Sequence, residues 1–272
     1  MKKRFMTVGL AALLLAACGD EEATTDNKET TEEVTTLKVA SLIPPMTEIL
    51  ELVEPQLEAD GIDLEIVVLG DNVQPNTALA ADEVDANFFQ HKPYMEEFNR
   101  NNEANLVPIE EIYFANYGVY AKNAASIEEL PEGATIAIAN DISNIDRSLA
   151  LLAQHHVITL GEKTDVYYTE ADVIDNPKNF VFETVDLLML ARMYDDADAV
   201  VMTPAYAAPL GLTPKSDALL TEGIDNDFAI TLVAREDNQD DEAIQALAEA
   251  MTSEDVRQFL EENYDETAIP AF

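Results

Sequence analysis

Positive charge and cysteine are the two things that this sequence most lacks. Its 272 residues include 15 lysines and arginines against 54 aspartates and glutamates, which gives a formal net charge of −39. A chain this acidic is a poor partner for nucleic acid or for an anionic membrane surface. The single cysteine, Cys18, has no partner for a disulfide within the chain. We therefore expect neither nucleic-acid binding nor an intrachain disulfide.

Histidine is also scarce, and its placement does not suit a metal site. His155 and His156 are adjacent, and adjacent side chains point apart on a helix. The third histidine, His91, is far away in sequence, and no Cys-x-x-Cys or His-x-x-x-His spacing is present. The sequence also lacks a G-x-S-x-G motif and a phosphate-cradling glycine loop. We expect no bound metal, no cofactor and no enzymatic activity.

The apolar run at residues 7–17 follows a basic start and is too short to span a bilayer stably. It is typical of a secretory signal peptide, which we expect at residues 1–17. The run ends in Leu15-Ala16-Ala17-Cys18, which resembles a lipobox and implies cleavage before Cys18 and lipid attachment to that residue. The mature protein is then anchored to a membrane rather than spanning it. The alternative is a chance cysteine after a signal peptide.

Residues 18–36 are rich in aspartate, glutamate and threonine and have almost no apolar side chains. Such a composition buries too little surface to offset chain entropy, so we expect a flexible, lipidated tether. Acidic residues continue through the rest of the chain and suggest a solvated coat. Adaptation to a salty or alkaline exterior and an acid-rich lineage without such pressure are both compatible with this pattern.

From residue 37 onward, short apolar runs alternate with amphipathic segments, which predicts α/β sheets with crossover helices. Two longer strand-like runs, 112–122 and 227–235, have the length of segments that cross between domains. These crossings divide the chain into a first lobe of residues 37–115 and 228–272 and an inserted second lobe of residues 116–227. A cleft between two lobes is the natural ligand site, and it closes by hinge motion.

The most informative stretch reads V-D-A-N-F-F-Q-H-K-P-Y at residues 84–94. Its first half is short and apolar, as in a buried strand, and Pro93 suits the first turn of a helix. Phe88, Phe89 and His91 thus arrive at the carboxyl end of a strand, where open α/β sheets hold ligands. The alternative is that the two phenylalanines fill the core and His91 caps the helix.

This stretch resembles the corresponding segment of the NlpA type of methionine-binding lipoprotein, the substrate-binding component of ABC importers. Further matching motifs follow in order over nearly all of the chain from residue 37: V-Q-P-N at 73–76, N-P-K-N at 176–179, G-L-T-P at 211–214 and R-E-D-N at 235–238. The resemblance implies a two-lobed type II periplasmic-binding-protein fold with a hinge and a ligand cleft between the lobes. It also implies an amino-acid ligand, an ABC permease as partner, and a lipid-anchored position on the extracytoplasmic face of the cell membrane. We expect a monomer.

The resemblance also implies roles for individual residues. Phe89, His91 and Tyr94 match positions around the ligand side chain, and Asn144 and Arg147 match groups that bind its main-chain part. Arg147 falls in what reads as the first turn of a helix, where a cation is disfavoured unless an anion lies opposite. A ligand carboxylate satisfies that condition. The alternative is a surface arginine paired with Asp141 or Asp146. On the ligand interpretation, Arg147→Ala causes a large loss of affinity and leaves the melting temperature of the empty protein unchanged.

The sequence departs from the family at four positions of the expected site. Asn72 replaces an aromatic residue, Thr203 and Ile230 each replace an asparagine, and Phe228 replaces a tyrosine, while Tyr206 is kept. Each lost amide removes a partner for the charged groups of an amino acid, worth ~1–3 kcal/mol when buried. We therefore weigh a methionine-like amino acid against another amino acid or a short peptide. Outside this class, a metal-capture lipoprotein and an adhesin remain as alternatives.

Overall fold

The computed structural model describes residues 34–272. The expected signal peptide, Cys18 and most of the expected tether lie outside the described residues. The first strand, β1 (Thr35–Ser41), begins two residues inside the expected tether. Its first residues are ordered by pairing, because Thr35 and Thr36 lie opposite Ile62 and Asp63 of the neighbouring strand.

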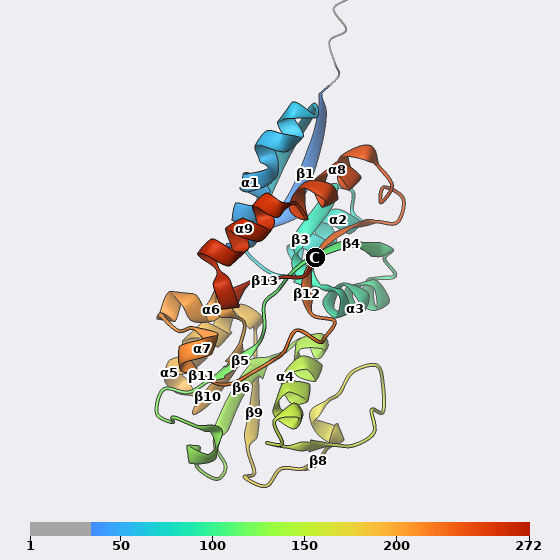
Figure 1. The fold of residues 1–272 in the computed structure, drawn as a ribbon. Coiled ribbons are helices and arrows are strands. Elements are labelled where there is room, and N and C mark those ends of the chain that lie inside the picture. Colours follow the sequence, from blue (N-terminus) through green and yellow to red (C-terminus); the bar gives the residue numbers. More distant parts are fainter. Residues whose placement is uncertain (1–33) are drawn as a thin grey trace, which may run out of the picture. The chain divides into compact units, whose positions relative to one another are not determined.

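The first sheet has six strands in the order β13-β4-β12-β3-β1-β2. Its remaining strands are β2 (Ile62–Val68), β3 (Ala86–His91), β4 (Leu106–Phe114), β12 (Ala229–Arg235) and β13 (Ile269–Pro270). β1 pairs in parallel with β2 and β3, whereas β12 runs antiparallel to both β3 and β4 (Figure 1). The late strand β12 therefore lies in the middle of a sheet that is otherwise built mostly from residues 35–114.

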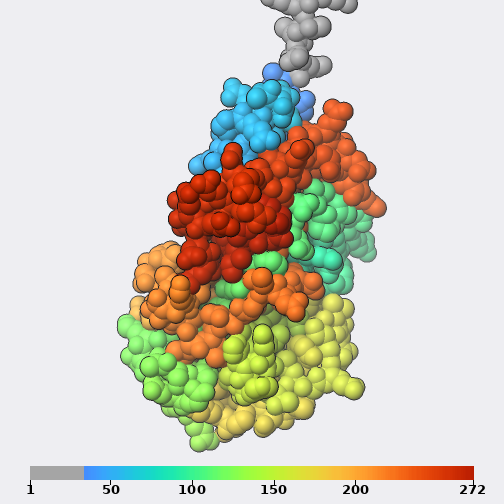
Figure 2. All heavy atoms as spheres, viewed as in Figure 1, coloured from blue at the N-terminus to red at the C-terminus, as the bar shows by residue number. Residues whose placement is uncertain are grey.

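Five helices cover the two faces of this sheet: α1 (Met46–Ala59), α2 (Gln74–Ala80), α3 (Lys92–Asn102), α8 (Glu242–Met251) and α9 (Glu254–Asn263). α1 buries Ile49, Leu50, Val53 and Leu57, the spacing of one helix face, in a core shared with α8 and α9. Each such side chain stabilises the fold by ~1.5–3 kcal/mol relative to exposure. Figure 2 shows the red C-terminal helices packed against the blue α1.

The second sheet has five strands in the order β11-β5-β10-β6-β9. Its strands are β5 (Gly118–Tyr120), β6 (Thr135–Ala139), β9 (Val181–Val185), β10 (Ala199–Met202) and β11 (Ala218–Thr221). All of them come from one continuous part of the chain, between β4 and β12 of the first sheet. The predicted lobe boundaries remain a prediction, and this nesting of one sheet's strands inside the other's supports it.

Four helices accompany the second sheet: α4 (Ile142–Gln154), α5 (Leu190–Asp196), α6 (Pro204–Ala207) and α7 (Pro214–Asp217). The short strands β7 (Thr159–Leu160) and β8 (Val173–Asp175) pair with each other in a separate small ladder. Single turns of 3-10 helix lie at Ile127–Glu129, Glu170–Asp172, Leu187–Met189, Ala208–Leu210 and Asp265–Thr267. Leu149, Leu151 and Leu152 of α4 are buried against this sheet.

The strand expected at 112–122 is broken, and side-chain hydrogen bonds explain why. β4 ends at Phe114 and β5 starts at Gly118, so residues 115–117 belong to no ladder. The carbonyl of Ala115 instead accepts a hydrogen bond from Arg147, and the N–H of Tyr117 donates to the Glu222 carboxylate. The backbone carbonyl and N–H groups that a longer strand would pair with a neighbouring strand are thus hydrogen-bonded to two side chains from distant segments.

Candidate functional site

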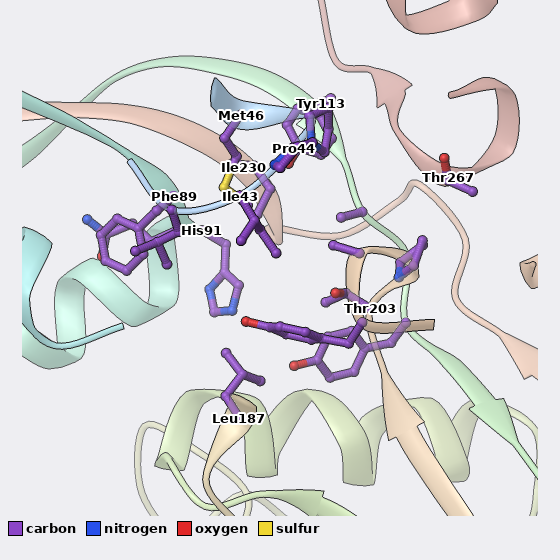
Figure 3. Close-up of a pocket in the computed structure, with 18 of the residues that line it drawn as sticks. Ile43, Pro44, Met46, Phe89, His91, Tyr113, Leu187, Thr203, Ile230 and Thr267 are labelled. Atoms are coloured by element: carbon purple, nitrogen blue, oxygen red, sulfur yellow. The ribbon is translucent and has the colours of Figure 1, made fainter. Parts of the chain in front are cut away.

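A cavity of about 430 Å³ lies between the two sheets and is lined by residues of both. Figure 3 shows the β1–α1 loop and the ends of β3 and β12 on one side of it, with Leu187 and Thr203 on the other. The lining is mostly aromatic and aliphatic, and its one charged side chain is that of Arg147. The expected residues that line it are Asn72, Phe89, His91, Tyr94, Asn144, Arg147, Thr203, Tyr206 and Ile230.

Phe228 is the expected site residue that does not line the cavity. Its ring lies behind two residues that do: the ring centroid is 5.1 Å from that of His91 and 4.6 Å from the Arg147 guanidinium carbon. Phe228 therefore supports His91 and Arg147 rather than facing the cavity itself.

A bulge in β3 aims the aromatic residues at the cavity. Opposite β3, Thr231 pairs with Gln90 and Leu232 with Phe88, so Phe89 is an extra residue without a partner. Phe89 and His91 both line the cavity. The bulge also places Gln90 on the same face of β3 as Asn87. The side-chain amides of Gln90 and Asn87 both donate to Oδ1 of the buried Asn76, at 2.5 and 2.9 Å. This satisfied amide network fixes the strand end.

Phe89, His91 and Tyr94 form one cluster of rings. Tyr94 meets Phe89 and His91 edge to face, at centroid distances of 5.9 and 6.2 Å. The Tyr94 hydroxyl donates to the carbonyl of Asn72 at 3.0 Å, which holds the ring in place. The cluster offers an apolar wall of the kind that accepts an aliphatic or thioether side chain.

His91 is a helix cap and a cavity residue at the same time. Its Nδ1 accepts a hydrogen bond from the N–H of Tyr94 in the first turn of α3, so the ring proton is on Nε2. Nε2 lies 3.1 Å from Oδ1 of Asn144, which accepts that proton's hydrogen bond. Burial, with the Arg147 charge as a second cause, lowers the pKa of His91 to about 3. The ring is therefore neutral at physiological pH.

Asn144 joins the two sides of the cavity. Its Oδ1 accepts from His91 of the first sheet and also from the Tyr117 hydroxyl at 2.7 Å. Its Nδ2 donates to Asp141, whose carboxylate also accepts the N–H of Asn144 and so caps α4. The cap of α4 is therefore Asp141, and the helix begins earlier than a first-turn position of Arg147 implies.

Because α4 begins at Ile142, Arg147 lies in the second turn and not in the first. Its side chain is 1% exposed and is paired neither with Asp141 nor with Asp146. Nε and Nη2 bind both carboxylate oxygens of Glu222 at 2.8 and 2.7 Å, and the guanidinium carbon lies 3.9 Å from the Tyr117 ring centroid. Nη1 makes no hydrogen bond to any residue in 34–272. The two N–H groups of Nη1 thus remain for a ligand.

Thr203 and Tyr206 bring hydroxyl groups to the cavity from the region of α6. Thr203 occupies the N-cap position of that helix, but its side chain does not make the capping hydrogen bond. Burial raises the pKa of Tyr206 to about 12, against a hydrogen bond from the Asn72 side chain that lowers it. Tyr206 therefore stays protonated at physiological pH, and both hydroxyls can donate or accept.

Several cavity residues were missed by the sequence analysis. The β1–α1 loop contributes Leu42, Ile43, Pro44, Pro45 and Met46, β4 and the segment after it contribute Tyr113, Ala115 and Tyr117, and the C-terminal segment contributes Tyr264 and Thr267. The period-two spacing of Tyr113, Ala115 and Tyr117 was the one available signal. The partner of Arg147, Glu222, had no signal, because it is one of many acidic residues.

The described residues show neither a metal site nor a membrane-spanning helix. Within residues 34–272, no group of three or more histidine, cysteine, aspartate or glutamate side chains is placed to hold a metal ion. His155 Nε2 donates to the carbonyl of Thr221 at 2.9 Å, on the surface and away from the cavity. No helix in the same part of the chain is long and apolar enough to cross a membrane.

An α/β fold with a cavity between two sheets, lined by aromatic and aliphatic groups around one arginine, defines a solute-binding protein of the periplasmic class. The chain belongs to the NlpA lipoprotein family, whose sequence profile matches residues 37–272. This confirms the family resemblance and the fold class that the sequence predicts.

Named relatives agree with this assignment. The chain is 36% identical to the methionine-binding lipoprotein MetQ of Bacillus subtilis. The alignment spans 277 residues and covers 99% of each chain. A nutrient-binding protein of Burkholderia cenocepacia, solved bound to methionine, is 30% identical with a TM-score of 0.83 and covers 87% of this chain and 100% of its own. A periplasmic substrate-binding protein of an ABC transporter from Coxiella burnetii is 33% identical with a TM-score of 0.81, over 86% of this chain and 100% of its own.

Proposed function

We propose that this protein captures a small amino-acid ligand, methionine or a close analogue, and delivers it to an ABC importer. The observation that carries the proposal is the cavity itself. Phe89, His91 and Tyr94 offer a wall for an apolar or thioether side chain, and Nη1 of Arg147 offers a donor for a carboxylate. The methionine-related names of the relatives support the same role.

The test is to identify the ligand that the protein carries. Residues 34–272, purified without refolding, are denatured, and the released small molecules are identified by mass spectrometry. Calorimetry on protein emptied by partial unfolding and dialysis then measures the binding of L-methionine and D-methionine. Release of an amino acid and saturable binding support the proposal. Absence of both a released ligand and binding by any of the twenty amino acids contradicts it.

A second candidate is the same transport role with another amino acid or a short peptide as ligand. Ile230 and Thr203 favour it, because they line the cavity where the family has asparagines, and Ile230 has no side-chain hydrogen-bonding atom. A free amino acid carries two charges within a few atoms and needs polar partners for both. Calorimetry with a panel of amino acids and dipeptides distinguishes the two candidates.

The position in the cell follows from the same proposal. We propose that Cys18 carries the lipid that anchors the mature protein to the extracytoplasmic face of the membrane, where an ABC permease receives the ligand. We further propose that the lobes formed by residues 37–115 with 228–272 and by 116–227 close around the ligand, and that the protein acts as a monomer. Sedimentation of residues 34–272 with and without ligand tests the last point.

A further inference from the structure

Tyr167 is a buried residue that reaches from one half of the molecule to the other, outside the cavity. It lies in residues 161–172, which connect β7 to β8, and its side chain does not line the cavity. The residue is 8% exposed, and its hydroxyl donates to the carbonyl of Pro93, in the first turn of α3, at 2.8 Å. The guanidinium carbon of Arg100, also in α3, lies 4.9 Å from the centroid of its ring. Tyr167 therefore contacts a helix of the first sheet through both its hydroxyl and its ring.

Residues 161–172 are fixed to α4 of the second sheet. The carboxylate of Asp146 in α4 accepts a hydrogen bond from the N–H of Tyr168 at 2.8 Å. The same carboxylate forms an ion pair with Lys163 at 3.0 Å. Both bonds lie within the proposed second lobe, so a hinge motion between the lobes leaves them intact. Tyr167 is thus held in a defined position relative to α4, and it moves with that helix.

The two helices that Tyr167 connects carry cavity residues of opposite walls. α3 follows its cap, His91, and includes Tyr94. α4 includes Asn144 and Arg147, and it lies against α3 (Figure 1). Inside the cavity, a hydrogen bond of 3.1 Å between His91 and Asn144 joins the two walls directly. Tyr167 adds a connection between the same helices at a place that a ligand in the cavity does not touch.

Opening of the two proposed lobes separates α3 from residues 161–172. α3 belongs to the proposed first lobe and residues 161–172 to the second, and neither is part of the stretches that connect the two sheets. Because residues 161–172 move with α4, opening breaks the hydrogen bond to Pro93 and the contact with Arg100. Contacts that exist in only one of two conformations shift the population toward that conformation. The contacts of Tyr167 therefore favour the closed arrangement.

A second contact between the proposed lobes lies on the molecular surface. The N–H of Lys215 in α7 donates to the Glu266 carboxylate at 3.2 Å. A hydrogen bond in a buried, low-dielectric place is stronger than one exposed to water. The contact of the buried Tyr167 is therefore expected to contribute more to closure than this exposed one.

We propose that Tyr167 is a positioning residue that holds the two lobes closed over the cavity without contacting the ligand. The inference rests on the proposed function, in which the lobes close around the ligand, and it assigns a contact that sets how strongly closure is favoured. Loss of one hydrogen bond lowers the ratio of closed to open protein about threefold to tenfold. The apparent affinity for a ligand that needs the closed form falls with the closed fraction. Tyr167 thus tunes ligand affinity from outside the cavity.

Single-molecule energy transfer between two dyes on residues 34–272 measures the closed fraction. This part of the chain contains no cysteine, so Glu58→Cys in α1 and Glu183→Cys in β9 place one dye on each proposed lobe at exposed positions. Tyr167→Phe removes the hydroxyl and keeps the ring. At half-saturating L-methionine it is expected to lower the ratio of closed to open protein about threefold to tenfold. Calorimetry should show an equal loss of L-methionine affinity, and stopped-flow measurements should show that the loss comes from faster dissociation.

The matched control is Tyr168→Phe, which removes a hydroxyl from the neighbouring residue. The Tyr168 hydroxyl makes no hydrogen bond within residues 34–272, and its ring contacts Lys163 of the same segment, at 4.4 Å. This variant is expected to keep both the closed fraction and the affinity of the unmodified protein. A purely structural role of Tyr167 would lower the melting temperature of Tyr167→Phe and leave its closed fraction unchanged.

Equal closed fractions for Tyr167→Phe and the unmodified protein, both with and without L-methionine, overturn the inference and leave the proposed function standing. An unmodified protein that binds none of the twenty amino acids contradicts the proposed function, and the closed fractions of the empty proteins then decide the inference alone. Should Tyr167→Phe fail to fold, Arg100→Gln, which removes the charge over the ring, takes its place. It is expected to lower the closed fraction as well, and an unchanged closed fraction overturns the inference.

Discussion

The Arg147 guanidinium and the Glu222 carboxylate form a buried bidentate ion pair, with N···O distances of 2.8 and 2.7 Å. Their side chains are 1% and 7% exposed. The same two groups bond the carbonyl of Ala115 and the N–H of Tyr117. The pair therefore fastens both of the segments that connect the two sheets, residues 115–117 and the stretch from Glu222 to β12. A ligand that contacts Nη1 touches a group that also braces these connections.

Arg147→Ala is expected to reduce both ligand affinity and stability. Removal of the guanidinium leaves the Glu222 carboxylate buried without its partner, which costs ~3–5 kcal/mol. The sequence alone led us to expect an unchanged melting temperature, because it gave Arg147 no structural partner. The ion pair with Glu222 leads us to expect a lower one. Urea denaturation measures the stability, and calorimetry with L-methionine measures the affinity.

The matched control is Lys122→Ala, which removes a solvent-exposed ion pair with Asp195. Its stability and ligand affinity should stay close to those of the unmodified protein, because exposed pairs contribute little. A free energy of unfolding for Arg147→Ala that is as high as for Lys122→Ala would show that the Glu222 pair is not a stabilising contact.

His91 gives the protein a predictable loss of stability in acid. Its pKa is about 3 in the folded state, below the ordinary value of 6.5 for an unfolded chain, because burial disfavours the charged ring. Between these pH values the unfolded chain binds a proton that the folded protein does not. The stability contributed by neutral His91 is therefore complete above pH about 6.5 and is lost as the pH falls toward 3.

The measurement is the free energy of unfolding at several pH values between 7 and 4. His91→Phe should flatten this dependence relative to the unmodified protein, while His155→Phe, which changes an exposed histidine, should leave it as it is. Equal slopes for the unmodified protein and His91→Phe would rule out a neutral, buried His91 as a cause of acid sensitivity.

Much of the fold was predictable because apolar periodicity carries local information. The alternation of strands and helices from residue 37 and the buried strand in the first half of residues 84–94 were predicted correctly from the sequence. What failed depended on contacts between distant segments. The break after Phe114 comes from hydrogen bonds to Arg147 and Glu222, and no local pattern at 112–122 encodes them.

The candidate site likewise combines residues that the sequence predicted with residues that only the structure revealed. The ring cluster of Phe89, His91 and Tyr94 was found through motif resemblance, and all three residues line the cavity. The roles of His91 as cap and as cavity residue were posed as two alternatives, and the structure shows both. Tyr113 was missed although its period-two spacing with Ala115 and Tyr117 was a signal, because the sequence does not show which face of that segment meets the cavity.

Cys18 is expected to carry the lipid anchor. In a host that processes lipoproteins, Cys18→Ser should leave the membrane fraction or remain unprocessed, since the serine hydroxyl cannot take lipid in place of the thiol. Fractionation and the mass of the mature amino terminus are the measurements. Cys18→Ala is the control for loss of the thiol without a new hydroxyl. A processed Cys18→Ser protein that stays in the membrane would contradict the proposal.

The last prediction concerns selectivity between ligands. Thr203 and Ile230 line the cavity, and neither offers the amide that the family resemblance places there. The Arg147 charge is already balanced by Glu222, so the two charges of free methionine meet few strong partners. We expect methionine to bind this protein with a dissociation constant above about 1 μM, which corresponds to roughly −8 kcal/mol.

The double variant Thr203→Asn with Ile230→Asn should bind methionine at least tenfold more tightly, because two buried amide hydrogen bonds are worth ~1–3 kcal/mol each. The matched control is Thr203→Val with Ile230→Val, which changes side-chain volume at the same positions without adding an amide. Calorimetry with L-methionine on all three proteins makes the comparison. Submicromolar binding by the unmodified protein would refute the idea that these two positions retune the cavity, and it would leave the family assignment intact.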